Sequence, residues 1–311
     1  MAESEEMGMA GHKVTWRGVF PAVTTQFRSD FSIDFGAIER MVQALVGEGI
    51  NGIIACGSVG ENASLSASEK RDVVSAIHSA AGARVPVLSG VAEITTEAAC
   101  AYARDMARLG IDGLMVMPPM IYSAAPREIE AWFRAIASAS DLPIMLYNNP
   151  PAYRNDIPPS LAKDLAGIDT IVAVKESSGD TRRFVDLYNL LGDRFLLFCG
   201  LDDVILETAS LGAVGWVSGL SNVFPRECSR LFELAVEGKP HEALALYRWI
   251  MPLLHLDARA DLVQCIKLCE AVAGRGSELT RPPRLPLSGT DRAQVEALMR
   301  KAIENRPQLG A

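Results

Sequence analysis

Gly110-Ile-Asp-Gly113, followed by the apolar run Leu-Met-Val-Met, decides the fold because the same phrase recurs along the chain. The other copies are Gly49-Ile-Asn-Gly52 before Ile-Ile-Ala-Cys and Gly212-Ala-Val-Gly215 before Trp-Val-Ser. Each copy follows an amphipathic run and opens an apolar one. The first glycine can take the left-handed conformation that ends a helix, and the second lets a strand begin close to its neighbours. The phrase is therefore typical of the joint between a helix and the next strand.

Less regular copies of this joint fill the rest of the chain and predict eight strands that are apolar on both faces, as buried parallel strands are. We expect the strands at 18–25, 52–56, 85–90, 113–117, 142–147, 170–175, 195–199 and 214–218. Eight such units in roughly 220 residues favour a closed barrel over a doubly wound open sheet, which usually has fewer strands and an early glycine-rich phosphate loop. The predicted fold class is α/β, a (β/α)8 TIM barrel with a C-terminal helical appendage.

Beyond Pro225 the strand pattern stops and only helical patterns follow. They are expected at 226–237, 240–255, 258–274 and 290–304, of which the last three would form the appendage. The sequence therefore predicts three parts. These are a flexible N-terminal tail at 1–14, the barrel at 15–225, and the last barrel helix with a C-terminal helical extension at 226–311.

The composition excludes several classes of partner. A net charge of −8 over 311 residues leaves no basic surface, so we expect no binding of nucleic acid. The 6 cysteines form no CxxC pair, which favours buried thiols in a reducing compartment over a disulfide framework or a structural metal. There is no apolar leader core and no stretch of membrane-spanning length, so we expect no membrane association and a cytoplasmic location.

Two strands of the predicted barrel end in side chains that can carry covalent chemistry. The active site of this fold lies at the carboxyl ends of the strands, and strand six ends in Ile171-Val-Ala-Val-Lys175. Burial there would lower the pKa of the lysine, which is the condition for an amine that attacks a carbonyl. Tyr147 ends strand five and could exchange the protons of imine formation. The alternatives are a lysine that reaches solvent and a core tyrosine with a satisfied hydroxyl.

The turns after three other strands supply candidate substrate-binding groups. Gly57-Ser58-Val59 follows strand two, where a hydroxyl and a backbone N–H could hold a carboxylate, although an ordinary connection explains such a turn equally well. Gly200 and Asp202 follow strand seven, and Gly219 follows strand eight. They could hold the distal end of a substrate, but Asp202 could equally be only a helix N-cap.

Four motifs in order resemble those of the dihydrodipicolinate synthase and N-acetylneuraminate lyase family, and the resemblance runs from about Trp16 onward. They are Gly57-Ser-Val-Gly-Glu61, Tyr147-Asn-Asn-Pro150, Val174-Lys175-Glu-Ser and Gly200-Leu-Asp202-Asp203. The resemblance implies that Lys175 forms the imine, that Tyr147 is the general acid and base, and that Ser58 with the N–H of Val59 holds the substrate carboxylate. It also implies a homotetramer, a dimer of dimers, with no metal or organic cofactor.

The chain departs from the synthases of that family in three places. Ala152 stands where they have an arginine for a second carboxylate, and the nearest arginine is Arg154. Val59 replaces the second threonine of the turn, and Ile121 replaces a tyrosine that crosses the dimer interface, with Tyr122 one residue along. A valine cannot relay a proton, so the lysine-biosynthesis reaction is disfavoured.

The sequence therefore predicts a class I, Schiff-base-forming lyase that acts on a small 2-oxo acid or cyclic imine by aldol cleavage, dehydration or deamination. Gly219 stands where sialic acid lyases have a serine, which indicates a shorter substrate. The segment 147–154 most resembles enzymes such as the hydroxyproline-pathway pyrroline-4-hydroxy-2-carboxylate deaminase. Arg154, Tyr122, Asp202 and Ser221 are expected in the specificity shell.

Three other functions compete with this prediction. One is a genuine 4-hydroxy-tetrahydrodipicolinate synthase, and another is a protein that binds a 2-oxo acid without turning it over. Both Lys175 and Tyr147 argue against simple binding, which needs no desolvated amine. The third is a metal-dependent barrel, which is disfavoured because none of the 4 histidines ends a predicted strand.

Overall fold

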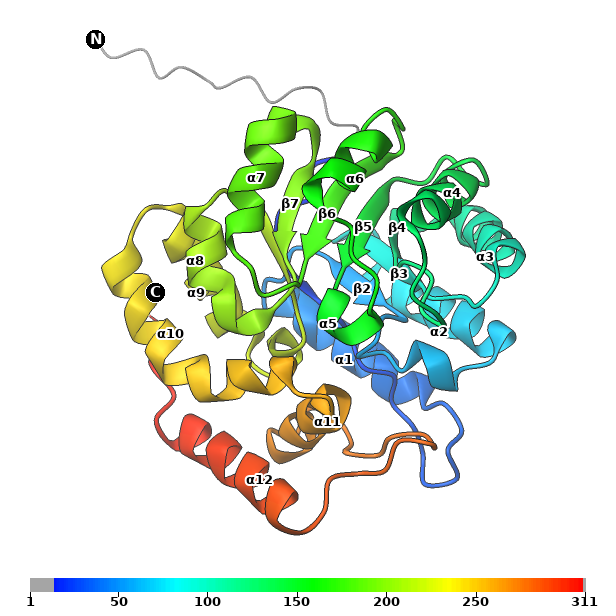
Figure 1. Ribbon diagram of the computed structural model, residues 1–311. Helices are drawn as coiled ribbons and strands as arrows, with labels where there is room; N and C mark the ends of the chain where they lie inside the picture. Colours follow the sequence, from blue (N-terminus) through cyan, green and yellow to red (C-terminus); the bar gives the residue numbers. More distant parts are fainter. Residues whose placement is uncertain (1–13, 310–311) are drawn as a thin grey trace.

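The computed structural model describes residues 14–309, and its centre is a barrel of eight parallel strands inside a ring of helices (Figure 1). The strands are β1 (Gly18–Pro21), β2 (Ile53–Ala55), β3 (Val87–Val91), β4 (Gly113–Val116), β5 (Ile144–Asn148), β6 (Ile171–Glu176), β7 (Leu196–Cys199) and β8 (Gly215–Ser218). The predicted TIM barrel is confirmed, with all eight strands at their predicted places. The predicted tail at 1–14 lies, apart from Val14, outside the described residues.

The barrel closes between its first two strands. Strand pairing runs in the order β1-β8-β7-β6-β5-β4-β3-β2. A parallel bridge joins Ala22 to Ile54, and the N–H of Val23 donates to the carbonyl of Ile54 at 3.0 Å. Strand β1 is shorter than predicted, since its pairing with β8 ends at Pro21. Beyond the bridge, Thr24 and Thr25 direct their hydroxyls to Glu270 and to the carbonyl of Gly60. The residues after β1 therefore connect the barrel to Glu270 near the C-terminus and to Gly60 in the turn after β2.

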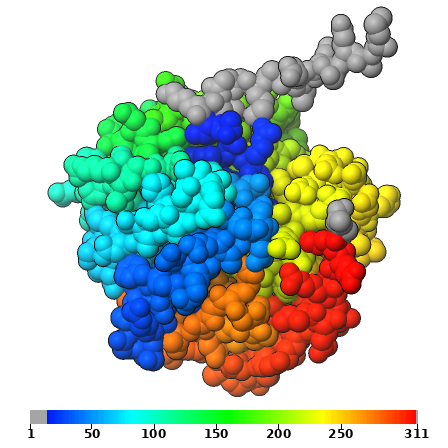
Figure 2. Space-filling model, turned by 180° about the vertical axis from the view of Figure 1, so that it is seen from behind, coloured from blue at the N-terminus to red at the C-terminus, as the bar shows by residue number. Residues whose placement is uncertain are grey.

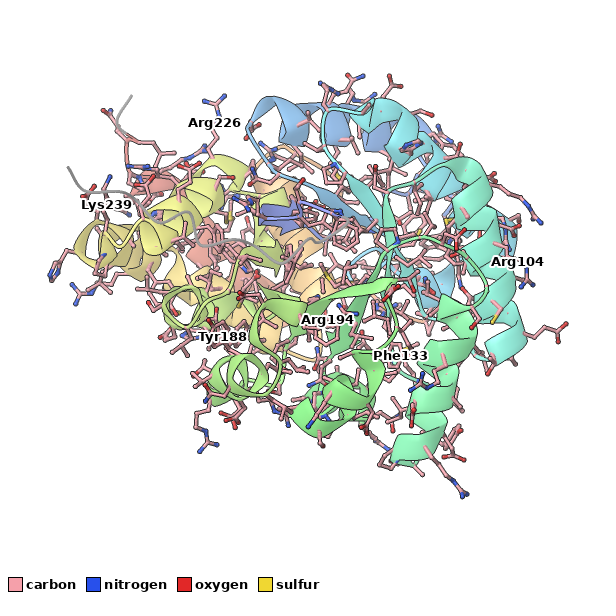
Figure 3. All side chains as sticks on the ribbon, turned by 90° about the horizontal axis from the view of Figure 1, so that it is seen from above. Arg104, Phe133, Tyr188, Arg194, Arg226 and Lys239 are labelled. Carbon is pink, nitrogen blue, oxygen red and sulfur yellow. The ribbon has the colours of Figure 1, made fainter. Side chains whose placement is uncertain are left out.

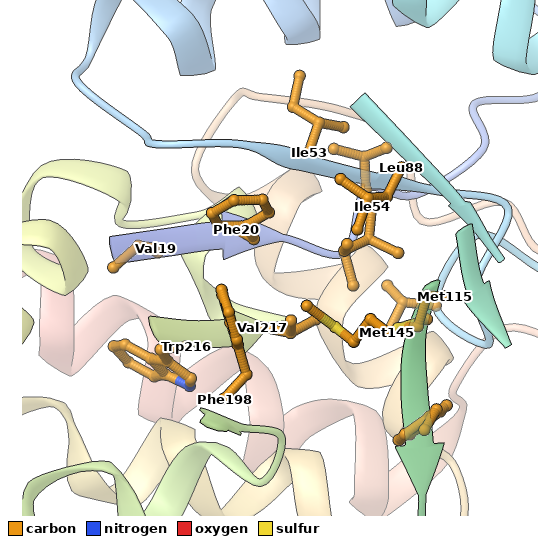
Figure 4. Close-up of a cluster of buried hydrophobic side chains, with 14 of the residues drawn as sticks. Val19, Phe20, Ile53, Ile54, Leu88, Met115, Met145, Phe198, Trp216 and Val217 are labelled. Atoms are coloured by element: carbon orange, nitrogen blue, oxygen red, sulfur yellow. The ribbon is translucent and has the colours of Figure 1, made fainter. Parts of the chain in front are cut away.

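The glycines of the repeated phrase do what the pattern predicts. Gly49, Gly110 and Gly212 all have positive φ, between 75° and 98°. The second glycines make room for aromatic rings, because a Cβ at Gly52 would lie 2.1 Å from the Phe20 ring and one at Gly215 would lie 2.1 Å from the Phe198 ring. These two rings pack edge to face across the barrel at 5.3 Å between centroids (Figure 4).

The barrel helices follow the strands in the expected alternation. They are α1 (Phe35–Gly47), α2 (Ala67–Ala81), α3 (Thr96–Leu109), α4 (Pro126–Ala137), α5 (Pro150–Tyr153), α6 (Pro159–Leu165), α7 (Arg182–Leu191), α8 (Ile205–Ser210) and α9 (Pro225–Val236). All of them except the short α5 bury residues on one face: Phe133 of α4 is fully buried, whereas Arg104 of α3 is exposed (Figure 3). A capping box between Ser66 and Glu69 begins α2.

The C-terminal helices form the predicted appendage. They are α10 (Pro240–Leu254), the 3-10 helix η5 (His255–Ala258), α11 (Leu262–Val272) and α12 (Gly289–Glu304). Helix α11 begins later than predicted because Arg259 is extended and ends η5. From behind, the orange and red C-terminal segments lie against the blue N-terminal part of the barrel (Figure 2).

The predicted division of the chain into a barrel and a C-terminal extension at residue 225 stays a prediction. Between residues 14 and 309, no helix has both the length and the apolar character that crossing a membrane requires.

Candidate active site

Lys175 lies at the barrel mouth between its neighbours in adjacent strands. In the register of the sheet it is opposite Tyr147 of β5 and Phe198 of β7. The side chain is buried, and this burial lowers the pKa of the amine from its ordinary value, against the nearby acids Asp257 and Asp202, which raise it. A lysine with a lowered pKa is neutral more often than an ordinary lysine at the same pH, and only the neutral amine is nucleophilic.

The glycine after β7 makes room for this lysine. A Cβ at Gly200 would lie 2.6 Å from Cε of Lys175 and 2.1 Å from Oγ of Ser177. Gly200 therefore lies against the lysine, and any side chain there would displace Lys175 or Ser177. The predicted role of Gly200 in substrate binding stays a prediction. Ser177 follows β6, and its hydroxyl is buried beside the lysine, where it opposes the rise in the pKa of the Tyr147 phenol.

Tyr147 lies against the lysine. The amino nitrogen of Lys175 is 3.9 Å from the centre of the Tyr147 ring. The phenol oxygen accepts a hydrogen bond from Asn149 at 3.1 Å, and burial raises the pKa of the phenol. The neighbouring Asn148 binds the carboxylate of Glu176 at 2.9 Å, which ties the end of β5 to the end of β6. Asn148 and Glu176, which follow Tyr147 and Lys175, thus hold the two strand ends together.

The turn after β2 has strained ends and, within the described residues, an unpaired backbone N–H between them. Its two ends, Cys56 and Glu61, both have positive φ, 50° and 56°. Positive φ in residues with side chains is strained, and such strain persists where the surrounding structure holds it. The backbone N–H of Val59 has no partner among residues 14–309, while its side chain is buried. The free N–H beside the Ser58 hydroxyl suits a carboxylate.

Tyr153 of α5 joins this turn to Tyr147, and the sequence reasoning missed it. Its hydroxyl is hydrogen-bonded to Oγ of Ser58. Its ring packs edge to face on Tyr147 at 5.6 Å between centroids, and burial raises the pKa of its phenol. The signal was present in the segment 147–154, but the side chain could not be placed without the short helix α5. Tyr153 therefore connects the Ser58 hydroxyl to the ring of Tyr147.

Asp202 is fully engaged in the protein interior. Its carboxylate accepts hydrogen bonds from Trp216 at 2.9 Å, from Ser218 at 3.2 Å and from the N–H of Leu220 at 3.0 Å. It does not cap the following helix with its side chain. Burial raises the pKa of this carboxyl well above its ordinary value. Asp202 therefore ties the end of β7 to β8 and to the segment after it.

The remaining predicted site residues differ in their exposure to solvent. Arg154 is exposed and ends α5 with φ of 60°. Tyr122 and Ile121 are exposed as well, at 55% and 70%. Ser221 is buried, and its Oγ donates to the carbonyl of Ser218. Their role in binding substrate stays a prediction.

The sequence reasoning also missed an acid that comes from the appendage. Asp257 of η5 accepts a hydrogen bond from the N–H of Asp202 at 3.2 Å. Burial raises the pKa of its carboxyl to about 6, and the charge of Lys175 opposes this rise. No local signal marked it, since it lies far beyond the barrel strands in sequence. Within the described residues no group of three or more metal-binding side chains is present.

Comparison with known proteins assigns the whole chain to one family. The profile of the Dihydrodipicolinate synthetase family matches residues 15–302. The chain belongs to this family. A 4-hydroxy-tetrahydrodipicolinate synthase of Methanothrix thermoacetophila is 31% identical over 287 residues, 92% of this chain and 97% of the relative. One of Prochlorococcus marinus is 33% identical over 282 residues, 90% and 92% of the two chains.

Solved structures of the family have the same fold. The 4-hydroxy-tetrahydrodipicolinate synthase of Methylacidiphilum fumariolicum superposes with a TM-score of 0.89 at 29% identity, over 93% of this chain and 97% of that one. The enzyme of Cyanidioschyzon merolae, solved with lysine bound, gives 0.88 at 30% identity, over 92% and 98%. The predicted family and the prediction that the chain is an enzyme of the lyase class are confirmed.

Proposed function

We propose that Lys175 forms a covalent imine with a small 2-oxo acid or cyclic imine, and that this imine drives a class I lyase reaction. The observation that carries the proposal is a buried amine of lowered pKa with its nitrogen 3.9 Å from the ring of Tyr147 at the end of the neighbouring strand. A site for simple binding would not need a desolvated amine, because desolvation destabilises its charge without adding a contact.

The residues around the lysine have distinct tasks in this reaction. The neutral amine attacks the C2 carbonyl, and the carbonyl oxygen leaves as water once it has received two protons. Tyr147 transfers protons, and Tyr153 connects it with Ser58. Ser58 Oγ and the N–H of Val59 hold the substrate carboxylate. The protonated imine then accepts the electron pair released when a bond beyond C3 breaks or a proton leaves C3, so no metal or organic cofactor is needed.

The specific reaction we propose is deamination of pyrroline-4-hydroxy-2-carboxylate, as in hydroxyproline breakdown. It requires one carboxylate site, which the turn after β2 supplies, and room for a hydroxyl on the ring. The alternative is 4-hydroxy-tetrahydrodipicolinate synthesis, the activity named for the relatives. Ala152 weighs against it, because it stands where the family resemblance expects an arginine that holds a second carboxylate.

Borohydride trapping tests the imine directly. The protein is incubated with pyruvate, reduced with borohydride and its intact mass measured, alongside Lys175→Ala and the exposed-lysine control Lys163→Ala. We expect one adduct in the parent and in Lys163→Ala, and none in Lys175→Ala with an unchanged far-UV circular dichroism spectrum. Because burial lowers the pKa of Lys175, the adduct should form at a lower pH than on an ordinary lysine. Absence of an adduct with every 2-oxo acid tried would overturn the proposal.

The two candidate reactions are then separated by their products. Incubation with pyrroline-4-hydroxy-2-carboxylate should release ammonia at a rate that depends on Lys175. Incubation with pyruvate and aspartate semialdehyde should give no cyclised product. A cyclised product from pyruvate and aspartate semialdehyde, with no release of ammonia from pyrroline-4-hydroxy-2-carboxylate, would assign the chain to 4-hydroxy-tetrahydrodipicolinate synthesis.

A further inference from the structure

Asp257 lies at the barrel mouth although it belongs to the C-terminal appendage. One oxygen, Oδ2, accepts the N–H of Asp202 at 3.2 Å. The other, Oδ1, lies 3.3 Å from the position that a Cβ would take at Gly219. Asp202 and Gly219 follow β7 and β8, and β7 is the strand that pairs with β6, where Lys175 lies. The carboxylate is therefore over the carboxyl ends of the strands next to the lysine.

The 3-10 helix η5 holds this carboxylate in place. His255 Nδ1 lies 2.8 Å from Oδ2 of Asp203, and the hydroxyl of Tyr247 donates to the carbonyl of Asp203 at 2.5 Å. Leu256, next to Asp257, is buried in the core. Oδ1 of Asp257 has no hydrogen-bond donor within the described part of the chain, and the residue is only half-buried. The mouth therefore presents a fixed carboxylate oxygen with a free acceptor position.

The charge of Asp257 reaches the reacting groups. It favours the charged form of Lys175 more than any other acid does, and it raises the pKa of the Tyr147 phenol and of the Cys199 thiol. These groups belong to β6, β5 and β7, so the carboxylate lies within electrostatic range of three strand ends. A second negative charge brought into the same space would be repelled.

We propose that Asp257 accepts a hydrogen bond from a hydroxyl on the distal part of the substrate, so that the site selects 2-oxo acids or cyclic imines with one carboxylate and a distal hydroxyl. This inference rests on the proposed imine at Lys175. The strands β6 and β2, which would hold C2 and the substrate carboxylate, are opposite each other in the barrel, so two sides are open to the far end of the molecule. The side where β7, β8 and η5 meet offers it the free acceptor oxygen of Asp257. An ionised carboxylate only accepts hydrogen bonds, so it binds a hydroxyl and rejects a second carboxylate.

The test compares two ligands that share the hydroxyl and differ in charge. These are 4-hydroxy-2-oxopentanoate and 4-hydroxy-2-oxoglutarate, with pyruvate as the reference that has no distal group. The concentration for half-maximal borohydride trapping is measured for each ligand in the parent, in Asp257→Asn and in Asp261→Asn. Asp261 is the control because it lies near Asp257 in sequence and is paired with Arg259 instead.

In the parent and in Asp261→Asn, the pentanoate should half-saturate at a concentration about tenfold below that of the glutarate, from like-charge repulsion. In Asp257→Asn this ratio should fall to near one. A change in the pKa of Lys175 would affect all three ligands alike and so leaves the ratio unaffected. An unchanged ratio, or an equal loss for all three ligands, would overturn the inference. If the parent traps no pyruvate, the imine proposal itself fails.

Discussion

One hydroxyl joins the turn after β2 to the end of β5. Val59 has no hydroxyl, and Tyr153 of α5 contacts both sides, with its oxygen on Ser58 and its ring on Tyr147. Ser58 and Tyr153 are 95 positions apart in the chain. We propose that Tyr153 passes protons between Ser58 and Tyr147 in the imine reaction.

Tyr153→Phe should lower kcat by roughly tenfold to a hundredfold, because a proton-transfer partner contributes on the order of 10² or more to a rate. The ring remains, so packing against Tyr147 should be kept and KM should change little. Steady-state kinetics on the substrate found by the ammonia assay would measure this. Tyr188→Phe, an exposed tyrosine of α7, is the control. A kcat within twofold of the parent would show that Tyr153 has no part in proton transfer.

At the scale of elements, one buried ion pair attaches α11 to the turn after β2. Lys267 Nζ lies 2.5 Å from Oε1 of Glu61, and both side chains are fully buried. The amine also donates to the carbonyl of Leu279 at 2.6 Å, and Oε2 of Glu61 accepts the N–H of Arg281 at 2.9 Å. The left-handed residue Glu61 thus holds the end of the turn through its contacts with the appendage.

Lys267→Met should lower the free energy of unfolding by about 3–5 kcal/mol, because it leaves the Glu61 carboxylate buried without a counter-charge. Urea denaturation followed by circular dichroism measures this change. The matched control is Lys301→Met, an exposed lysine in the last turn of α12. If the free energy of unfolding falls by less than about 1 kcal/mol, the Lys267–Glu61 ion pair contributes no more to stability than an exposed ion pair does.

For the whole molecule, we propose the homotetramer that the family resemblance implies. Apolar side chains are exposed after two neighbouring strands, Ile94 at 74% and Ile121 at 70%. Exposed apolar groups gathered on one face are typical of surfaces that other chains cover. The resemblance places Ile121 at the interface within a dimer.

Sedimentation velocity should give a species close to four times the chain mass of 33.5 kDa. Ile121→Asp should shift it to smaller species, because burying an unpaired carboxylate costs several kcal/mol. Leu285→Asp is the control, since Leu285 is equally exposed, at 72%, but lies elsewhere in the chain. A monomer in the parent at micromolar concentration, or equal behaviour of the two variants, contradicts the proposal.

The sequence by itself determined the barrel and the pair at its centre. Helix-to-strand joints and apolar strands are local patterns, and parallel strands put consecutive strand ends at one mouth, so Lys175 and Tyr147 had to be neighbours. The repeated pattern also predicted that the backbone at Gly52 and Gly215 lies close to its neighbours.

Only the tertiary structure decided what surrounds that pair. Tyr153, Asp257 and the buried Lys267 reach the mouth or its turn through packing between segments far apart in sequence, and no local pattern encodes such packing. The same holds for Asp202, whose two possible roles looked equal in sequence until Trp216 and Leu220 were seen to bind its carboxylate. Local periodicity specifies elements, while the directions of side chains at their ends depend on every element packed against them.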